Sequence, residues 1–127
     1  MTEWRWVAQE VVWAIHDRQL AEHGGLDGVL DRGVESAIGR PQNLDAYGEP
    51  DGAELAAAYA FGLARNHGFA DGNKRTAWVV ARLFLAENDR DLRFDKADAI
   101  RTVEDLAAGR LTEAALADWF RARIVSP

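Results

Sequence analysis

Apolar residues recur along most of this chain at intervals of three and four positions, the spacing that places side chains on one face of an α-helix. Near the N-terminus this spacing is carried by four residues, Trp4, Val7, Val11 and Ile15. It predicts a first helix from about Glu3 to Glu22. The glycine-rich stretch GGLDG at positions 24–28 is typical of a connector that ends a helix.

A long apolar run in the second half of the chain predicts a buried helix. The run AWVVARLFLA covers Ala77–Ala86, and Arg82 is its one charged residue. A helix that is apolar on nearly all sides is usually surrounded by the rest of the protein. We therefore expect this segment, extended to about Glu87, to be the central helix of the fold.

Polar residues with capping spacing mark the starts of three more helices. Asp51 and Glu54 have the spacing of a capping box and predict a third helix that runs to about Asn66. Asp95 is expected to cap a fifth helix, and Thr112 is expected to cap the last. The fifth helix should end at a glycine and carry three apolar residues on one side, Ile100, Val103 and Ala107.

The segment before the third helix combines a short helix with an irregular loop. Asp31 can cap a second helix, which is expected to end before Pro41 because the residue preceding a proline avoids the helical conformation. Two prolines and a glycine then predict a loop over 41–50, PQNLDAYGEP.

The pattern as a whole predicts an all-α fold. The helices have short links between them, and no strand-like run of any length occurs. We expect one domain over residues 1–127, built as a compact bundle of about six helices around the central buried helix.

Composition narrows the possible functions. A net charge of −6 argues against general binding of nucleic acid, which requires a basic surface. The chain has no cysteine, which excludes disulfides and thiolate chemistry and fits a reducing cytoplasm. The N-terminal residues lack the pattern of a secretion signal, and no stretch approaches the ~18 apolar residues of a membrane span. We therefore expect a cytoplasmic protein without a membrane partner.

The candidate chemistry lies directly before the long apolar run, in HGFADGNKRTA at positions 67–77. The first backbone N–H groups of a helix have no partner within the helix, and its dipole makes that end positive. Lys74 and Arg75 add full positive charge there, so this loop and helix start predict an anion site, and phosphate is the expected anion. Asp71 is an oxygen ligand of the kind that Mg²⁺ uses together with phosphate groups. Asn73 is expected at the cap position, where it can bind phosphate oxygens.

Other polar residues have simpler interpretations. His16 and His23 lie on the same side of the first predicted helix but are ~10 Å apart along its axis, too far to share a metal ion. We interpret them as ordinary packing or surface residues. Arg65 is interpreted as a solvated residue near the end of the third helix.

The motif HxFxDGNKRTA resembles the signature of the Fic/Doc superfamily, and specifically its death-on-curing (Doc) toxin branch. The wider Fic pattern is HxFx[D/E]GNGRxxR, and this chain departs from it at two positions. Lys74 stands in place of the second Gly, and Trp78 stands in place of the second Arg. Both departures are typical of the Doc branch, whose toxins are phosphotransferases, and not of AMP-transferring Fic enzymes. The upstream GGL segment is also similar to that branch.

The resemblance implies a role for each motif residue. His67 would be the general base toward an acceptor hydroxyl, and Asp71 would bind Mg²⁺ beside the phosphates of ATP. The expected catalytic residues are His67, Asp71, Lys74 and Arg75. The expected phosphate-binding residues are Gly72, Asn73, Lys74 and Arg75.

The resemblance also implies partners. Doc toxins pair with an antitoxin whose C-terminal segment folds onto the toxin as a helix, and their protein substrate is elongation factor Tu. The inhibitory motif [S/T]xxxE[G/N] of some Fic proteins does not occur in this sequence, so inhibition is expected from another chain. Two alternatives stay open: an AMP transferase, and a non-catalytic relative that binds a nucleotide or a partner.

Overall fold

The predicted all-α fold is confirmed. The computed structural model describes residues 3–25, 33–65 and 72–125, and within them it contains six helices and one pair of two-residue strands. The helices are α1 (Gln9–His23), α2 (Gly33–Tyr47), α3 (Gly52–Arg65), α4 (Asn73–Glu87), α5 (Lys96–Ala107) and α6 (Glu113–Arg123). The strands β1 (Asp91–Leu92) and β2 (Ile124–Val125) pair antiparallel, with Asp91 opposite Val125. None of the described helices is long and apolar enough to cross a membrane.

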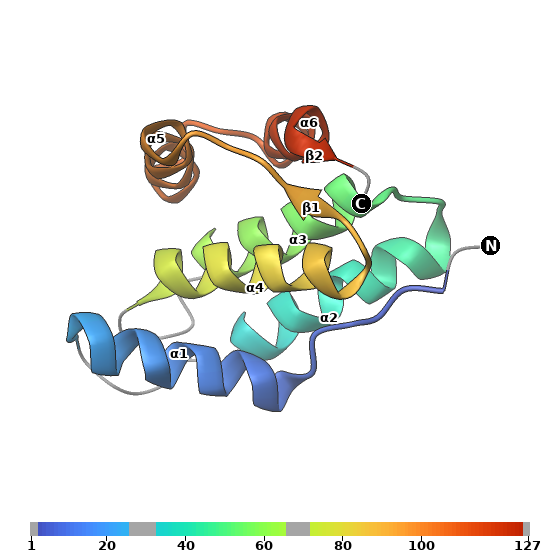
Figure 1. Cartoon of the computed structure of the whole chain (residues 1–127). Helices are drawn as coiled ribbons and strands as arrows, with labels where there is room; N and C mark the ends of the chain where they lie inside the picture. The colour runs from blue at the N-terminus through green and yellow to red at the C-terminus, as the bar shows by residue number, and fades with distance from the viewer. Residues whose placement is uncertain (1–2, 26–32, 66–71, 126–127) are drawn as a thin grey trace.

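The helices form three layers (Figure 1). The middle layer contains α3 and α4 side by side, α1 and α2 lie on one side of it, and α5 and α6 lie on the other. Helix α3 is the central element, because it packs against α2, α4, α5 and α6 and because 11 of its 14 residues are buried. Its many alanines allow these neighbours to approach closely.

The prediction that Ala77–Ala86 is the central helix is therefore wrong in part. This segment forms α4, which buries one side of its surface against α3 and α1. On its outer side Arg82 is exposed, and Val79 and Leu83 are only partly buried. An apolar run thus identified a helix of the middle layer, but it could not show that a part of its apolar surface stays open to solvent.

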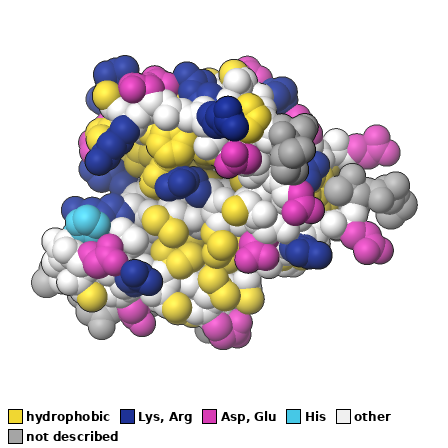
Figure 2. All heavy atoms as spheres, viewed as in Figure 1, with side chains coloured by type: hydrophobic (Ala, Val, Ile, Leu, Met, Phe, Trp, Pro, Cys, Tyr) yellow, Lys and Arg dark blue, Asp and Glu magenta, His cyan; other side chains and the backbone are white. Residues whose placement is uncertain are grey.

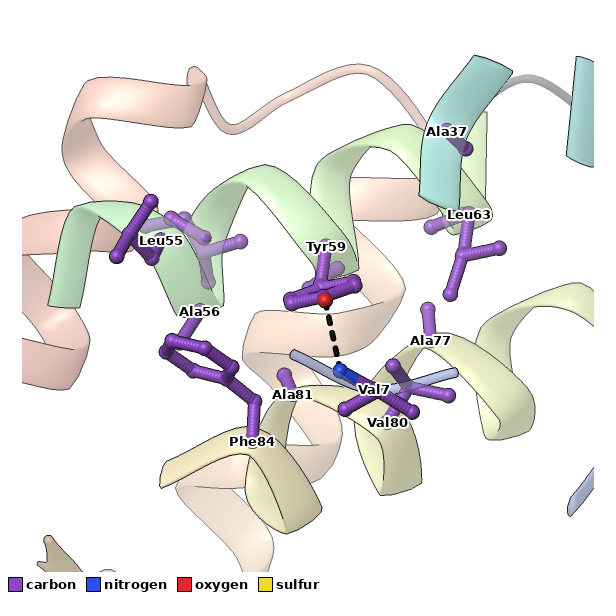
Figure 3. Packing of buried hydrophobic residues seen from close by; sticks show 14 of the residues in the cluster. Val7, Ala37, Leu55, Ala56, Tyr59, Leu63, Ala77, Val80, Ala81 and Phe84 are labelled. Atoms are coloured by element: carbon purple, nitrogen blue, oxygen red, sulfur yellow. Dashed lines mark hydrogen bonds between the residues drawn. The ribbon is translucent and has the colours of Figure 1, made fainter. Parts of the chain in front are cut away.

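Tyr59 of α3 lies at the centre of the hydrophobic core (Figure 3). Its ring is fully buried, and it contacts the ring of Phe84 at a centroid distance of 5.3 Å. The backbone N–H of Val7 donates a hydrogen bond to the Tyr59 hydroxyl at 3.0 Å. Burial raises the pKa of this phenol, so the group stays neutral in the core.

The first helix begins later than predicted, at Gln9, because residues before it make tertiary contacts outside any helix. The Asn88 side chain accepts a hydrogen bond from the Arg5 N–H and donates one to the Arg5 carbonyl, at 2.8 and 2.9 Å. Trp6 stacks on Phe84 at 5.9 Å. Backbone groups held by a side chain far along the sequence are not available for a helical ladder.

The second helix continues past Pro41 to Tyr47, so the predicted helix end is wrong, and the loop predicted over 41–50 is correct only for residues 48–50. The buried residues of α2 are Val34, Ala37, Ile38 and Pro41. Their spacing is that of one helical stripe, and this stripe packs against α3. Burial of the proline within the stripe outweighs the loss of one backbone hydrogen bond. The predicted cap, Asp31, lies outside the described residues.

Three predicted caps are confirmed by hydrogen bonds. Asp51 accepts from the Glu54 N–H at 2.8 Å, and Glu54 accepts from the Asp51 N–H at 3.4 Å, which completes the capping box. Asp95 caps α5 by accepting from the Asp98 N–H at 3.0 Å. Thr112 caps α6 by accepting from the N–H three residues later at 3.1 Å. Local sequence was sufficient for these three starts because both partners lie within one turn.

Candidate functional site

The start of α4 is built on a glycine in the left-handed conformation. Gly72 has φ of 77° and is buried, and its carbonyl accepts the N–H of Thr76 at 3.0 Å as the first bond of the helix. This backbone conformation favours glycine over all residues with a side chain. Asn73, expected at the cap, is instead the first residue within the helix, because Gly72 occupies the cap position.

The first turn of α4 is strongly positive. Lys74 and Arg75 are both exposed there, and the turn contains no acidic residue. The Nζ of Lys74 lies 3.0 Å from an Oε of Glu104 on α5, and both side chains are about half exposed. An exposed ion pair of this kind contributes little stability, so Lys74 can exchange this partner for a phosphate group. Among the described residues, Arg75 forms no ion pair.

His16 of α1 lies against the same helix start. Its ring is 2% exposed, and a methyl group placed on Gly72 would lie 3.5 Å from its Cδ2 and 3.6 Å from a methyl of Leu20. His16 is thus a buried residue at the contact between α1 and α4, and His23 is exposed. Sequence reasoning did not connect His16 with the motif, because the two are brought together only by the packing of α1 on α4.

Two predicted catalytic residues, His67 and Asp71, lie in the segment 66–71, outside the described residues. Their roles stay predictions. Within the rest of the chain, no cluster of three His, Asp or Glu side chains is placed to hold a metal ion. The structure therefore brings together Gly72, Asn73, Lys74 and Arg75 from the predicted site, and adds His16 beside them.

A groove of about 470 Å³ runs between α4 and α5 from this helix start. Its lining residues are Lys74, Arg75, Trp78, Arg82, Phe94, Lys96, Ala99, Ile100, Val103 and Glu104. Figure 2 shows hydrophobic side chains between the two helices, bordered by Lys and Arg. The buried side of α5 consists of Ala99, Thr102 and Leu106. The side predicted to be apolar is therefore not the buried side: Ile100 is 55% exposed and faces the groove with Val103.

Comparison with known proteins decides the family. The family model described as Fic/DOC family matches residues 6–85, which is more than half of the chain. The chain belongs to the Fic/DOC family. It is 38% identical over 119 residues to "Protein kinase doc" of Escherichia phage P1, an alignment that covers 92% of this chain and 94% of the phage protein. It is 46% identical over 77 residues to "Toxin Doc" of Mycolicibacterium smegmatis, which covers 57% of this chain and 58% of that protein.

Trp78 departs from the wider pattern of this Fic/DOC motif, and the structure shows what it does instead. Its ring contacts Phe94 edge-on at 5.1 Å and stacks on Phe120 at 6.3 Å. Arg82, one turn later, has its guanidinium 5.6 Å from the Trp78 ring and 5.1 Å from the Phe94 ring. Position 78 therefore supplies an aromatic wall of the groove and no positive charge for a phosphate.

Proposed function

We propose that this Fic/DOC protein is the toxin of a toxin–antitoxin pair and acts as a protein phosphotransferase. It would move the γ-phosphate of ATP to a hydroxyl of a translation factor, elongation factor Tu, and so block translation in the cytoplasm. The names of the two relatives, a protein kinase and a toxin, support this proposal.

The observation that carries the proposal is the acid-free first turn of α4. Lys74 and Arg75 are the second and third residues of this helix, at the positive end of its dipole. Phosphoryl transfer depends mostly on positioning and on neutralising charge, and two cations at a helix start supply both. Position 78, where the AMP-transferring pattern has its second arginine, is occupied by Trp78, which packs among aromatic rings.

The reaction assigns a task to each motif residue. His67 accepts the proton of the acceptor hydroxyl, whose oxygen bonds to the γ-phosphorus while the bond to the β-phosphate oxygen breaks and ADP leaves. Lys74 and Arg75 hold the phosphates. Asp71 would be the protein ligand of Mg²⁺, and phosphate oxygens and water would supply its other ligands. Such an ion would neutralise phosphate charge when bound.

The proposed partner is an antitoxin whose C-terminal segment binds this chain as a helix. The internal inhibitory motif of some family members does not occur in these 127 residues, and the proposal assigns control to a separate chain. No direct binding of nucleic acid is proposed, because the chain carries a net charge of −6.

Controlled expression in bacterial cells tests the proposal. The parent protein is expected to arrest growth, and His67→Ala is expected to lose this effect because no base remains to accept the hydroxyl proton. His23→Ala is the matched control, since His23 is exposed at the end of α1 and is expected to arrest growth like the parent. Circular dichroism should show equal helix content in all three. Arrest by His67→Ala as strong as by the parent would refute the assigned base.

A further inference from the structure

Helix α1 is mostly exposed, and one of its two buried residues is a histidine. The buried residues are Val12 and His16, which are four positions apart and therefore lie on one face of the helix. The His16 ring is 2% exposed. Packing alone favours an apolar side chain at such a position, because a buried imidazole gives up its hydrogen bonds to water. A histidine here therefore indicates a polar contact in addition to packing.

The His16 ring lies beside the residue from which α4 begins. A Cβ placed on Gly72 would lie 3.5 Å from Cδ2 and 3.6 Å from Nε2 of His16. These two atoms form one edge of the imidazole ring, so this edge faces Gly72. Both distances are ordinary van der Waals contacts, and the ring therefore fits against the buried glycine without strain. A methyl group of Leu20 lies 3.6 Å from the same point and completes the surface of α1 against Gly72.

Gly72 determines where the basic turn of α4 lies. Its φ of 77° is in the left-handed region, and its carbonyl accepts the N–H of Thr76 at 3.0 Å. A change in the torsion angles of this one residue therefore moves the first helical turn, which carries Lys74 and Arg75. Burial holds neither cation in place, because both are exposed and the ion pair of Lys74 with Glu104 is about half exposed. Their position relative to a phosphate thus depends on the backbone that carries them.

We propose that His16 is a positioning residue for phosphoryl transfer, whose buried ring holds the Gly72 backbone and with it the first turn of α4. The inference rests on the proposed function and adds a residue of α1 to the motif. At 2% exposure the ring is closed to a substrate, so it acts only through Gly72. Phosphoryl transfer is sensitive to such positioning, since a displacement of ~1 Å can lower a rate ~100-fold.

Three substitutions of His16 separate packing from the polar contact. His16→Phe keeps a buried ring but has no nitrogen. The side-chain amide nitrogen of glutamine falls near the position of Nε2, and that of asparagine falls near Nδ1. Because the Nε2 edge faces Gly72, His16→Phe and His16→Asn are expected to lower kcat for γ-phosphate transfer to elongation factor Tu about 10- to 100-fold. His16→Gln is expected to keep kcat within about threefold of the parent value.

The Michaelis constant and the stability of each variant complete the kinetic test. KM for ATP should stay within about threefold of the parent value, because a loss confined to the transition state leaves KM unchanged. Val12→Ala is the matched control, since Val12 is the other buried residue of this face. It should lower the midpoint of urea unfolding through lost core packing and leave kcat unchanged. Parental kcat in His16→Phe or His16→Asn, or a kcat in His16→Gln as low as in His16→Phe, would overturn the proposal.

Hydrogen exchange followed by NMR tests the contact without any substrate. The Thr76 N–H reports whether Gly72 is held, because its bond to the Gly72 carbonyl is the first bond of α4. Relative to the Val80 N–H in the middle of α4, its exchange should become about tenfold faster in His16→Phe and stay at the parent rate in His16→Gln and Val12→Ala. An unchanged rate in His16→Phe would overturn the proposal.

The two assays distinguish this proposal from the proposed function. A parent protein that transfers no γ-phosphate would overturn the proposed function, and the role of His16 in that reaction with it. Transfer by the parent together with parental kcat in His16→Phe would overturn the role of His16 alone.

Discussion

Replacing Gly62 with alanine adds one methyl group at a tight contact between α3 and α2. The new Cβ would lie 3.0 Å from the Cβ of Ala37 and 3.3 Å from its Cα. Alanine is favoured over glycine within a helix by ~1 kcal/mol. Overpacking against a neighbouring backbone costs ~1–3 kcal/mol, since α2 must move as a unit. We therefore expect Gly62→Ala to lower the free energy of unfolding by about 1 kcal/mol.

Gly39 of α2 provides the matched control, because a Cβ added there meets no atom within 4 Å. Gly39→Ala is expected to raise the free energy of unfolding by ~0.5–1 kcal/mol through helix propensity alone. The assay is urea unfolding followed by circular dichroism. The double variant Gly62→Ala with Ala37→Gly moves one methyl group across the interface and should return stability close to that of the parent. A stabilising Gly62→Ala, or a double variant weaker than both single variants, would refute the tight α2–α3 contact.

Two further predictions concern individual polar groups. The Thr76 hydroxyl is buried without a hydrogen-bond partner in the described structure, so Thr76→Val should raise the free energy of unfolding by ~1 kcal/mol. The Thr102 hydroxyl donates a hydrogen bond to the Asp98 carbonyl at 2.8 Å, so Thr102→Val should lower the free energy of unfolding by ~1 kcal/mol. The same change in the free energy of unfolding for both variants, measured by urea unfolding, would contradict the different bonding of the two hydroxyls. Burial raises the pKa of the Asp51 carboxyl, but hydrogen bonds from Arg121 and from backbone N–H groups outweigh burial and leave the pKa lowered. The ionised cap therefore stabilises the fold above the unfolded pKa of ~3.9, and this contribution is lost as the pH falls through the folded pKa. Asp51→Ala should lower the free energy of unfolding by ~1 kcal/mol at neutral pH and by progressively less below about pH 4. A loss of stability that does not change with pH would refute the role of the charge.

The sequence was a reliable guide where the deciding contacts are local. The caps at Asp51, Asp95 and Thr112 were predicted because each side chain bonds to a backbone group within the next turn. The sequence did not predict the start of α1, because this start depends on hydrogen bonds between Arg5 and Asn88, far along the sequence. It did not predict that α2 continues through Pro41 either, because this depends on packing against α3. Tertiary contacts can override local preference at such positions.

For the site, the motif located the cationic helix start but not its surroundings. Lys74 and Arg75 were predicted at the start of a helix, and the structure places them there. The His16 ring against Gly72, and the partnership of Lys74 with Glu104, depend on the packing of α1 and α5 on α4. Neither helix carries a motif that would indicate these contacts, since a packed neighbour leaves no signal beyond ordinary helical spacing.

The most direct test of the central claim follows two labels on ATP. Purified protein is incubated with elongation factor Tu and Mg²⁺, and with ATP labelled on either the γ- or the α-phosphate. Lys74 and the aromatic packing of Trp78 disfavour AMP transfer, so we predict that the γ-label appears on the acceptor and the α-label does not. Lys74→Gly should lose γ-transfer without gaining α-transfer, because Trp78 still supplies no positive charge. Acceptor labelled from the α-phosphate by the parent protein would contradict the phosphotransferase and favour an AMP transferase.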